Sequence, residues 1–134
     1  MAVFKIPKRP LLAALFTLAL LFAVGCGKEE TVHHITSAEA EKLMTKLSNA
    51  VIIDVREPDE YEKKHIKGAI LVPLGDLRDG NFGKLPGKKT PLFVYCWTGR
   101  RSSDAADILA KEGYTTIYEI GGLVEWTGPT EGEE

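Results

Sequence analysis

The chain of 134 residues is poor in cysteine, with only Cys26 and Cys96, so it is not a small domain held together by several disulfides. It shows no internal repeat and no low-complexity tract, which excludes solenoid and compositionally disordered architectures. Histidine is also scarce: His33 and His34 are adjacent rather than at ligand spacing, and His65 is distant in sequence. No pattern typical of a nucleotide or haem site is present. We therefore expect neither a metal ion nor a cofactor.

The sequence also lacks an apolar run long enough to cross a bilayer comfortably. The longest run, residues 11–24, spans 14 residues, whereas a membrane helix needs roughly 20. It follows a short basic head formed by Lys5, Lys8 and Arg9. A basic head before a short apolar run is typical of a secretory signal peptide, and a membrane anchor that is never cleaved is the alternative.

The end of this segment resembles the lipobox of bacterial lipoproteins. Residues 23–26 read Ala-Val-Gly-Cys, with Ala23 where leucine is usual. The resemblance implies a lipoprotein signal peptide over residues 1–25 and a Cys26 that is linked to diacylglycerol after cleavage. The protein would then belong to the bacterial cell envelope, anchored by lipid to a membrane on the periplasmic or extracellular side. An ordinary signal peptide that precedes a cysteine by chance is the alternative.

The charge balance argues against a nucleic-acid partner. The chain carries 17 basic and 19 acidic side chains, and the three basic residues before Cys26 would be lost with the signal peptide. The remaining 14 basic and 19 acidic residues give a net charge of −5, which is not typical of a nucleic-acid-binding protein. Within this part we expect a short tether over residues 26–34, one domain over residues 35–127 and a solvated acidic tail over residues 128–134.

Between the tether and the tail, strand-like and helix-like segments alternate. Thr36 and Glu39 are spaced as a capping box, which predicts a helix start. The predicted helices cover residues 36–47, 58–61, 102–111 and 123–126, the predicted strands cover residues 51–53, 69–72, 92–95 and 116–118, and residues 75–89 are expected to form a loop. This alternation predicts an α/β fold with a mostly parallel sheet and helices on both faces.

The chemistry gathers around Cys96, which follows a buried strand and precedes a helix. Ligands bind at the carboxyl ends of strands in open α/β sheets, and a loop that turns into a helix directs backbone N–H groups at one point. Such a cradle stabilises an anion and favours a reactive thiolate, and Arg100 and Arg101 add positive charge. A buried structural cysteine is one alternative, and a disulfide between Cys26 and Cys96 is another.

Several motifs together resemble the rhodanese family. They are Asp54-Val55-Arg56-Glu57, Glu60-Tyr61, His65-Ile66-Lys67-Gly68-Ala69-Ile70, the loop from Cys96 to Arg101, and Gly121-Gly122 with Trp126. The resemblance covers about Ile35 to Trp126 and implies a rhodanese-like fold and sulfurtransferase activity. It implies that Cys96 accepts sulfur from a small anionic donor such as thiosulfate, holds it as a persulfide, and passes it to a thiol or to cyanide.

The resemblance also implies roles for the loop residues. Backbone N–H groups from Trp97 to Arg101 would hold the persulfide, the two arginines would bind the anionic donor, and Ser102 would hydrogen-bond the cradle. The residues implied in substrate binding are Trp97, Thr98, Gly99, Arg100, Arg101 and Ser102.

Two further residues are expected to support the site. Asp54 and Arg56 match the family's Asp-x-Arg, and we expect Arg56 to pair with Glu60. The sequence departs from the family pattern at Lys64, where glycine is usual, and at Trp97, which is large for a position beside the nucleophile. Trp97 either shields the persulfide or narrows the choice of donor.

Two other functions remain open at this stage. Cysteine-based phosphatases and arsenate reductases also place a cysteine and an arginine around an anion, but their spacing is C-x5-R, whereas Cys96 and Arg101 give C-x4-R. A persulfide carrier that does not turn over, or an interaction or redox-sensing module, would use the same cysteine. The sequence leaves the physiological donor and acceptor and the oligomeric state undetermined.

Overall fold

The computed structural model describes residues 29–133, so the predicted signal peptide and Cys26 lie outside the described residues. The elements are β1 (Val32–His34), α1 (Ser37–Met44), β2 (Val51–Asp54), α2 (Pro58–Lys63), β3 (His65–Ile66), β4 (Ile70–Leu71), α3 (Leu74–Arg78), β5 (Leu92–Cys96), α4 (Arg100–Glu112), β6 (Ile117–Gly122), the 3-10 helix η1 (Leu123–Glu125) and β7 (Thr130–Glu131). Five strands form a sheet in the order β1-β6-β5-β2-β4, and every neighbouring pair is parallel. The predicted α/β fold is confirmed.

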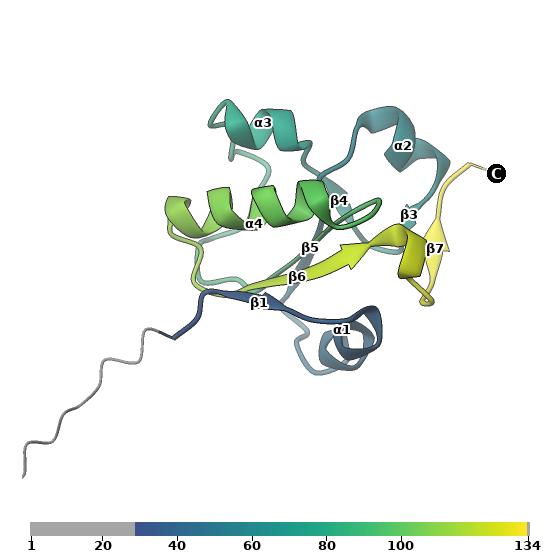
Figure 1. The fold of residues 1–134 in the computed structure, drawn as a ribbon, viewed down its shortest axis with the longest axis horizontal. Helices are drawn as coiled ribbons and strands as arrows, with labels where there is room; N and C mark the ends of the chain where they lie inside the picture. Colours follow the sequence, from purple (N-terminus) through teal and green to yellow (C-terminus); the bar gives the residue numbers. More distant parts are fainter. Residues whose placement is uncertain (1–28, 134) are drawn as a thin grey trace, which may run out of the picture.

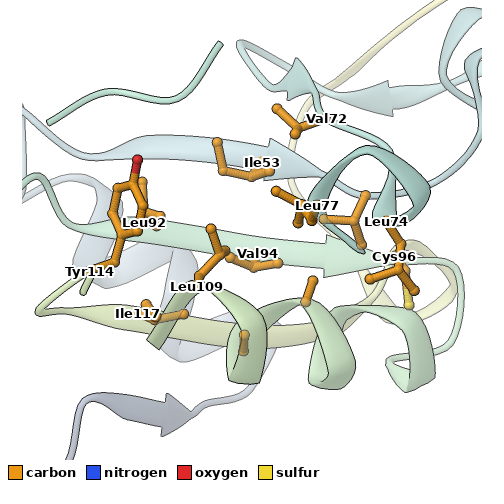
Figure 2. Close-up of a cluster of buried hydrophobic side chains, with 13 residues drawn as sticks. Ile53, Val72, Leu74, Leu77, Leu92, Val94, Cys96, Leu109, Tyr114 and Ile117 are labelled. Carbon is orange, nitrogen blue, oxygen red and sulfur yellow. The ribbon is translucent and has the colours of Figure 1, made fainter. Parts of the chain in front are cut away.

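Helices cover both faces of this sheet, with α3 and α4 on one face and α1 on the other (Figure 1). The central strand β5 shows the consequence, because all five of its side chains are buried. Leu92, Val94 and Cys96 pack among the residues of α3 and α4, as Figure 2 shows, whereas Phe93 and Tyr95 belong to the cluster on the α1 side. A parallel strand covered on both faces is apolar throughout rather than alternating, which is why its sequence was recognisable.

Helix α4 begins directly after the loop that follows β5. Its buried residues Ser102, Ala105, Ala106 and Leu109 recur at helical spacing and face the sheet. The chain enters and leaves the helix through glycines in the left-handed region, with φ of 104° at Gly99 and 106° at Gly113. Other residues resist this conformation, so the glycine before the helix fixes where the loop ends. The predicted helix over residues 102–111 is confirmed and begins two residues earlier.

At both ends of the predicted domain, residues beyond its bounds pair with strands inside it. Residues 32–34, assigned to the tether, form β1 and pair with β6 at the edge of the main sheet. Residues 130–131, assigned to the solvated tail, form β7 and pair antiparallel with β3. A Cβ on Gly132 would lie 2.4 Å from the carbonyl oxygen of Lys63, so the backbone of the tail touches the end of α2. Backbone pairing holds both ends, and composition does not reveal it.

The predicted loop over residues 75–89 is partly wrong. Its first residues belong to α3, whose Leu74 and Leu77 are buried in the core on the α4 side. The many glycines and lysines further along the segment concealed this single helical turn. By contrast, the predicted capping box is confirmed, since the Thr36 side chain accepts from the backbone of Glu39 and the Glu39 carboxylate accepts from the backbone of Thr36.

A buried ion pair links β2 to β5 and to the turn before β3. The Asp54 carboxylate accepts hydrogen bonds from Arg56 Nη2 at 2.7 Å and from the Tyr95 hydroxyl at 2.5 Å. Arg56 also donates to the Lys64 carbonyl at 2.6 Å, and the Tyr95 oxygen accepts from the Ile66 N–H at 3.0 Å. Burial, followed by the charge of Asp54, raises the pKa of Tyr95, so its hydroxyl remains a donor. The predicted partner of Arg56 was Glu60, and the structure corrects this to Asp54.

This network predicts a large loss of stability when one charge is removed. Arg56→Met would leave the carboxylate of Asp54 buried without its cation, and we expect the free energy of unfolding to fall by about 3 kcal/mol. Urea unfolding followed by circular dichroism measures this change. The matched control is Lys111→Met, at an exposed position of α4, with an expected change within about 0.5 kcal/mol. Equal effects of the two substitutions would contradict a structural role for the ion pair.

Candidate active site

Cys96 is the last residue of β5 and lies at the carboxyl edge of the parallel sheet, where α4 begins. Its side chain is buried with only 1% of the residue exposed. The Gly99 N–H donates a hydrogen bond to Sγ over 3.0 Å, and Sγ lies 3.5 Å from the Ser102 hydroxyl. The loop therefore bends back over the sulfur and directs a backbone donor at it, which stabilises negative charge there.

The end of β6 forms the floor beneath this loop. A Cβ on Gly122 would lie 2.1 Å from the Trp97 carbonyl oxygen, and a Cβ on Gly99 would lie 3.4 Å from Gly121 Cα. The Val124 N–H also donates to the Trp97 carbonyl at 3.2 Å. Gly121 and Gly122, which the sequence analysis named as part of a family motif, are the last two residues of β6, and they permit two backbones to meet.

A carboxylate that the sequence analysis missed lies beside the cysteine. Glu119 of β6 is only 7% exposed, and its Oε1 accepts hydrogen bonds from the Ser102 hydroxyl and from the Gly121 N–H at 3.0 Å. Its Oε2 lies 3.0 Å from Nδ1 of His34 on β1. The predicted strand stopped at Tyr118, although an acidic residue between Tyr118 and Ile120 was a signal that a buried strand continued through a polar site.

Arg101 is held in place by Glu60, which the sequence analysis had paired with Arg56. Its Nη1 and Nη2 donate to the two carboxylate oxygens of Glu60 on α2, at 2.7 and 2.9 Å. These hydrogen bonds lower the pKa of Glu60 to about 2, so the carboxylate stays ionised throughout the neutral and mildly acidic range. The pKa of Arg101 is raised mainly by its hydrogen bonds to Glu60, and the charge of Cys96 contributes in the same direction.

The other predicted site residues are distributed around this centre. Trp97, Thr98 and Arg100 are exposed, and Trp97 leaves 46% of its surface accessible. Asp54 and Arg56 lie in the buried network between β2 and β5, where they support the sheet beside the loop. The structure thus brings Gly99 and Ser102 directly to the sulfur and places the remaining loop side chains at the surface above it.

Neither a metal site nor a membrane-spanning helix is present within residues 29–133. No three His, Cys, Asp or Glu side chains gather there as metal ligands would. Over the same residues, no helix combines the length and the apolar character needed to span a membrane. In this part of the chain Cys96 is present as a free, buried thiol.

Comparison with known proteins identifies relatives of this site. The model of the rhodanese-like domain matches residues 36–129. Thiosulfate sulfurtransferase PspE of Escherichia coli (strain K12) is 39% identical over 77 residues, which cover 58% of this chain and 74% of that protein. The putative sulfur carrier protein YrkF of Bacillus subtilis (strain 168) is 38% identical over 81 residues, 60% of this chain but only 43% of that protein.

A solved structure shows the same fold. The structure described as rhodanese with anions from E. coli superimposes with a TM-score of 0.57 at 36% identity, and the match covers 63% of this chain and 99% of that one. The segment matched by the family model contains both the cysteine loop and its β6 floor. The chain therefore belongs to the rhodanese-like domain family.

Proposed function

We propose that this protein is a sulfurtransferase that carries sulfur as a persulfide on Cys96. One observation carries the proposal: a buried thiol at the carboxyl end of β5 receives a backbone hydrogen bond from Gly99 at 3.0 Å. Relatives named thiosulfate sulfurtransferases at 39% and 34% identity support the same activity. A small anionic donor such as thiosulfate suits the positive charge of Arg100 and Arg101 beside the loop.

The transfer proceeds in two displacements at sulfur. The thiolate of Cys96 attacks the outer sulfur of thiosulfate, a new S–S bond forms, and the bond within thiosulfate breaks as sulfite leaves with its electron pair. The Gly99 N–H remains beside the cysteine sulfur during this exchange. A thiol or cyanide then attacks the outer sulfur of the persulfide, and Cys96 leaves as a thiolate. No external oxidant or reductant is needed, because sulfite and the acceptor balance the electrons.

Arg101 is better suited than Arg100 to orient the donor. Its guanidinium is fixed by two hydrogen bonds to Glu60, whereas Arg100 is exposed at the start of α4. A cation that is already ordered loses less conformational freedom when it binds an anion. Its spacing from Cys96 is one residue shorter than the C-x5-R of phosphatases, which argues for sulfur rather than for a phosphate group.

A persulfide carrier is the second candidate function. The relative named as a putative sulfur carrier is 38% identical over 81 residues, so the same domain type occurs in such proteins. A carrier would form the persulfide and release it only to a dedicated acceptor. Thiosulfate turnover with cyanide as acceptor separates this function from the first.

We also propose that the chain is lipid-anchored in a bacterial cell envelope through Cys26. The proposal is supported by the basic head, the 14-residue apolar run and the Ala-Val-Gly-Cys motif that ends it. This site lies outside the described residues and is independent of the chemistry at Cys96. A lone thiol at Cys96 then has no cysteine with which to form an intramolecular disulfide.

Removing the nucleophile provides the first test. Cys96→Ser is expected to lower thiocyanate production from thiosulfate and cyanide by about a thousandfold or more, because a serine hydroxyl is not ionised at neutral pH. The assay uses the full chain, with p-nitrophenyl phosphate as a counter-substrate. The wild-type tryptic peptide that contains Cys96 should gain the mass of one sulfur atom after exposure to thiosulfate. A persulfide without thiocyanate would favour the carrier, and phosphate release would contradict both functions.

The two neighbouring arginines offer a matched pair of variants. Arg101→Gln is expected to raise the KM for thiosulfate about tenfold, since one charge-assisted contact contributes about 1.5 kcal/mol. Arg100→Gln removes the same charge from an exposed position, and we expect a change of less than about threefold. Steady-state kinetics at one ionic strength measures both values. A larger effect at Arg100 would reverse the assignment of the donor-binding residue.

The lipid anchor is tested separately by mass spectrometry of the mature protein from a bacterial host. We expect an N-terminal Cys26 that carries diacylglycerol, and Cys26→Ser should leave the precursor uncleaved. The Cys96→Ser variant serves as the control, because it retains the motif and should be processed like the wild type. An unmodified Cys26 thiol in the mature protein would exclude the anchor.

A further inference from the structure

Glu119 is a buried acid to which sulfur transfer, as described so far, gives no role. It lies on β6 with 7% of its surface exposed, opposite the start of α4. The Gly121 N–H and the Ser102 hydroxyl both donate to Oε1, so this oxygen has two hydrogen-bond donors within the protein. Its second oxygen faces His34 at 3.0 Å.

These contacts form a continuous hydrogen-bonded path from the Cys96 sulfur to the surface. Cys96 Sγ lies 3.5 Å from the Ser102 oxygen, and the Ser102 hydroxyl contacts Glu119 Oε1. His34 continues the chain from Oε2, and 63% of its side chain is exposed. Because Cys96 itself is 1% exposed, its thiol proton has little direct access to water, and this chain offers a hydrogen-bonded route.

Few charged side chains lie around Cys96 and Glu119, the two acids that Ser102 connects. Cys96 on β5 experiences the positive charge of Arg101 from α4, and Glu60 of α2 pairs with that cation. Glu119 is approached by His34 from β1 and by Ser102 from α4, and among the described residues His34 is the one basic side chain that pairs with it. An ionised thiol and an ionised carboxylate would therefore confront each other across a single hydroxyl.

We propose that Cys96 and Glu119 share one proton through Ser102, so that Glu119 accepts the thiol proton when Cys96 attacks a sulfur donor. This role rests on the proposed function. The S–H bond breaks as the proton passes to the Ser102 oxygen, the Ser102 proton passes to Glu119 Oε1, and the thiolate keeps the electron pair for the attack. Glu119 acts through Ser102 and is a positioning residue rather than a catalytic one.

Sharing one proton has a kinetic signature. Attack that passes its proton to Glu119 needs no hydroxide, so this part of the rate does not change with pH while the carboxylate is ionised. Attack by free thiolate adds a second part, which grows as the pH rises. The rate of attack by Cys96 should therefore level off towards low pH. A lone thiol would instead react about tenfold faster for each pH unit below its titration.

The test is the rate of alkylation of Cys96 by iodoacetamide, measured from pH 5 to pH 8 on the full chain. The modified tryptic peptide that contains Cys96 is quantified by mass spectrometry, so Cys26 does not contribute. We expect the wild-type rate to level off towards pH 5, whereas the rate for Glu119→Gln should keep falling by about tenfold per pH unit. Glutamine retains an oxygen that can accept from Gly121 and Ser102, so the local backbone is conserved.

Three further variants assign the effect. Ser102→Ala interrupts the route while leaving the carboxylate, and it should give the same steep profile, which keeps the test decisive if Glu119→Gln does not fold. His34→Gln should keep the wild-type pH profile. A steep profile for His34→Gln would identify His34 as the proton acceptor and overturn the proposal. Glu112→Gln removes a partly exposed carboxylate that pairs with Lys88 at the end of α4, away from Cys96; it is the matched control and should behave like the wild type.

Structural and chemical outcomes are distinguishable. If Glu119→Gln lowers the rate by the same factor at every pH, Glu119 only shapes the loop and the proposal is wrong. A steep wild-type profile would also overturn it. Alkylation involves no sulfur donor, so a protein that fails to turn over thiosulfate can still show the shared proton, and an active enzyme can lack it.

Discussion

The backbone of residues 97–99 lies against the last glycines of β6, and the position of the Cys96 sulfur depends on that contact. Gly122 allows the Trp97 carbonyl to approach so closely that a Cβ would overlap with it. Gly99 can then adopt its left-handed conformation and direct its N–H at Cys96. The start of α4 follows at once, so the loop, the sulfur and the helix are fixed by one meeting of two strands rather than by side chains.

Around this backbone arrangement, charges occur in pairs. Asp54 is matched by Arg56 within the core, and Arg101 is matched by Glu60 at the edge of the site. The buried pair orders the turn that follows β2, because Arg56 also binds the Lys64 carbonyl. Pairing reduces the cost of placing charge near a buried sulfur, since each ion keeps a partner when water is excluded. Each of these four charged side chains therefore has a partner before a donor binds.

The parts of the fold that repeat a local signal could be predicted from the sequence. The apolar run of β5, the helical spacing of α4 and the capping box before α1 each depend on neighbouring residues. Partners far apart in sequence could not be predicted: Glu60 is spaced to favour Arg56 one helical turn away, yet it binds Arg101 across 41 positions. Strands of two or three residues at the domain ends carry too little pattern to be separated from a tether or a tail.

Glu119 shows the same limit at the candidate site. Its contacts to Ser102 and to His34 span 17 and 85 positions, and they exist because β6 lies beside both β1 and the start of α4. Only the topology of the sheet brings these three residues together. The cysteine loop was recognisable because its residues are consecutive, whereas the groups that surround it come from four different elements.

The exposed Trp97 also makes this loop suitable for study by tryptophan fluorescence. The chain has two tryptophans, and Trp126 packs beside the cluster on the α1 face, where the Pro129 carbonyl accepts from its indole N–H. Trp97 instead follows Cys96 directly and keeps nearly half of its surface in solvent. Under the proposed sulfur transfer, loading of Cys96 would change the surroundings of the residue next to it, and Trp97 emission would then report that loading against a nearly constant background from Trp126.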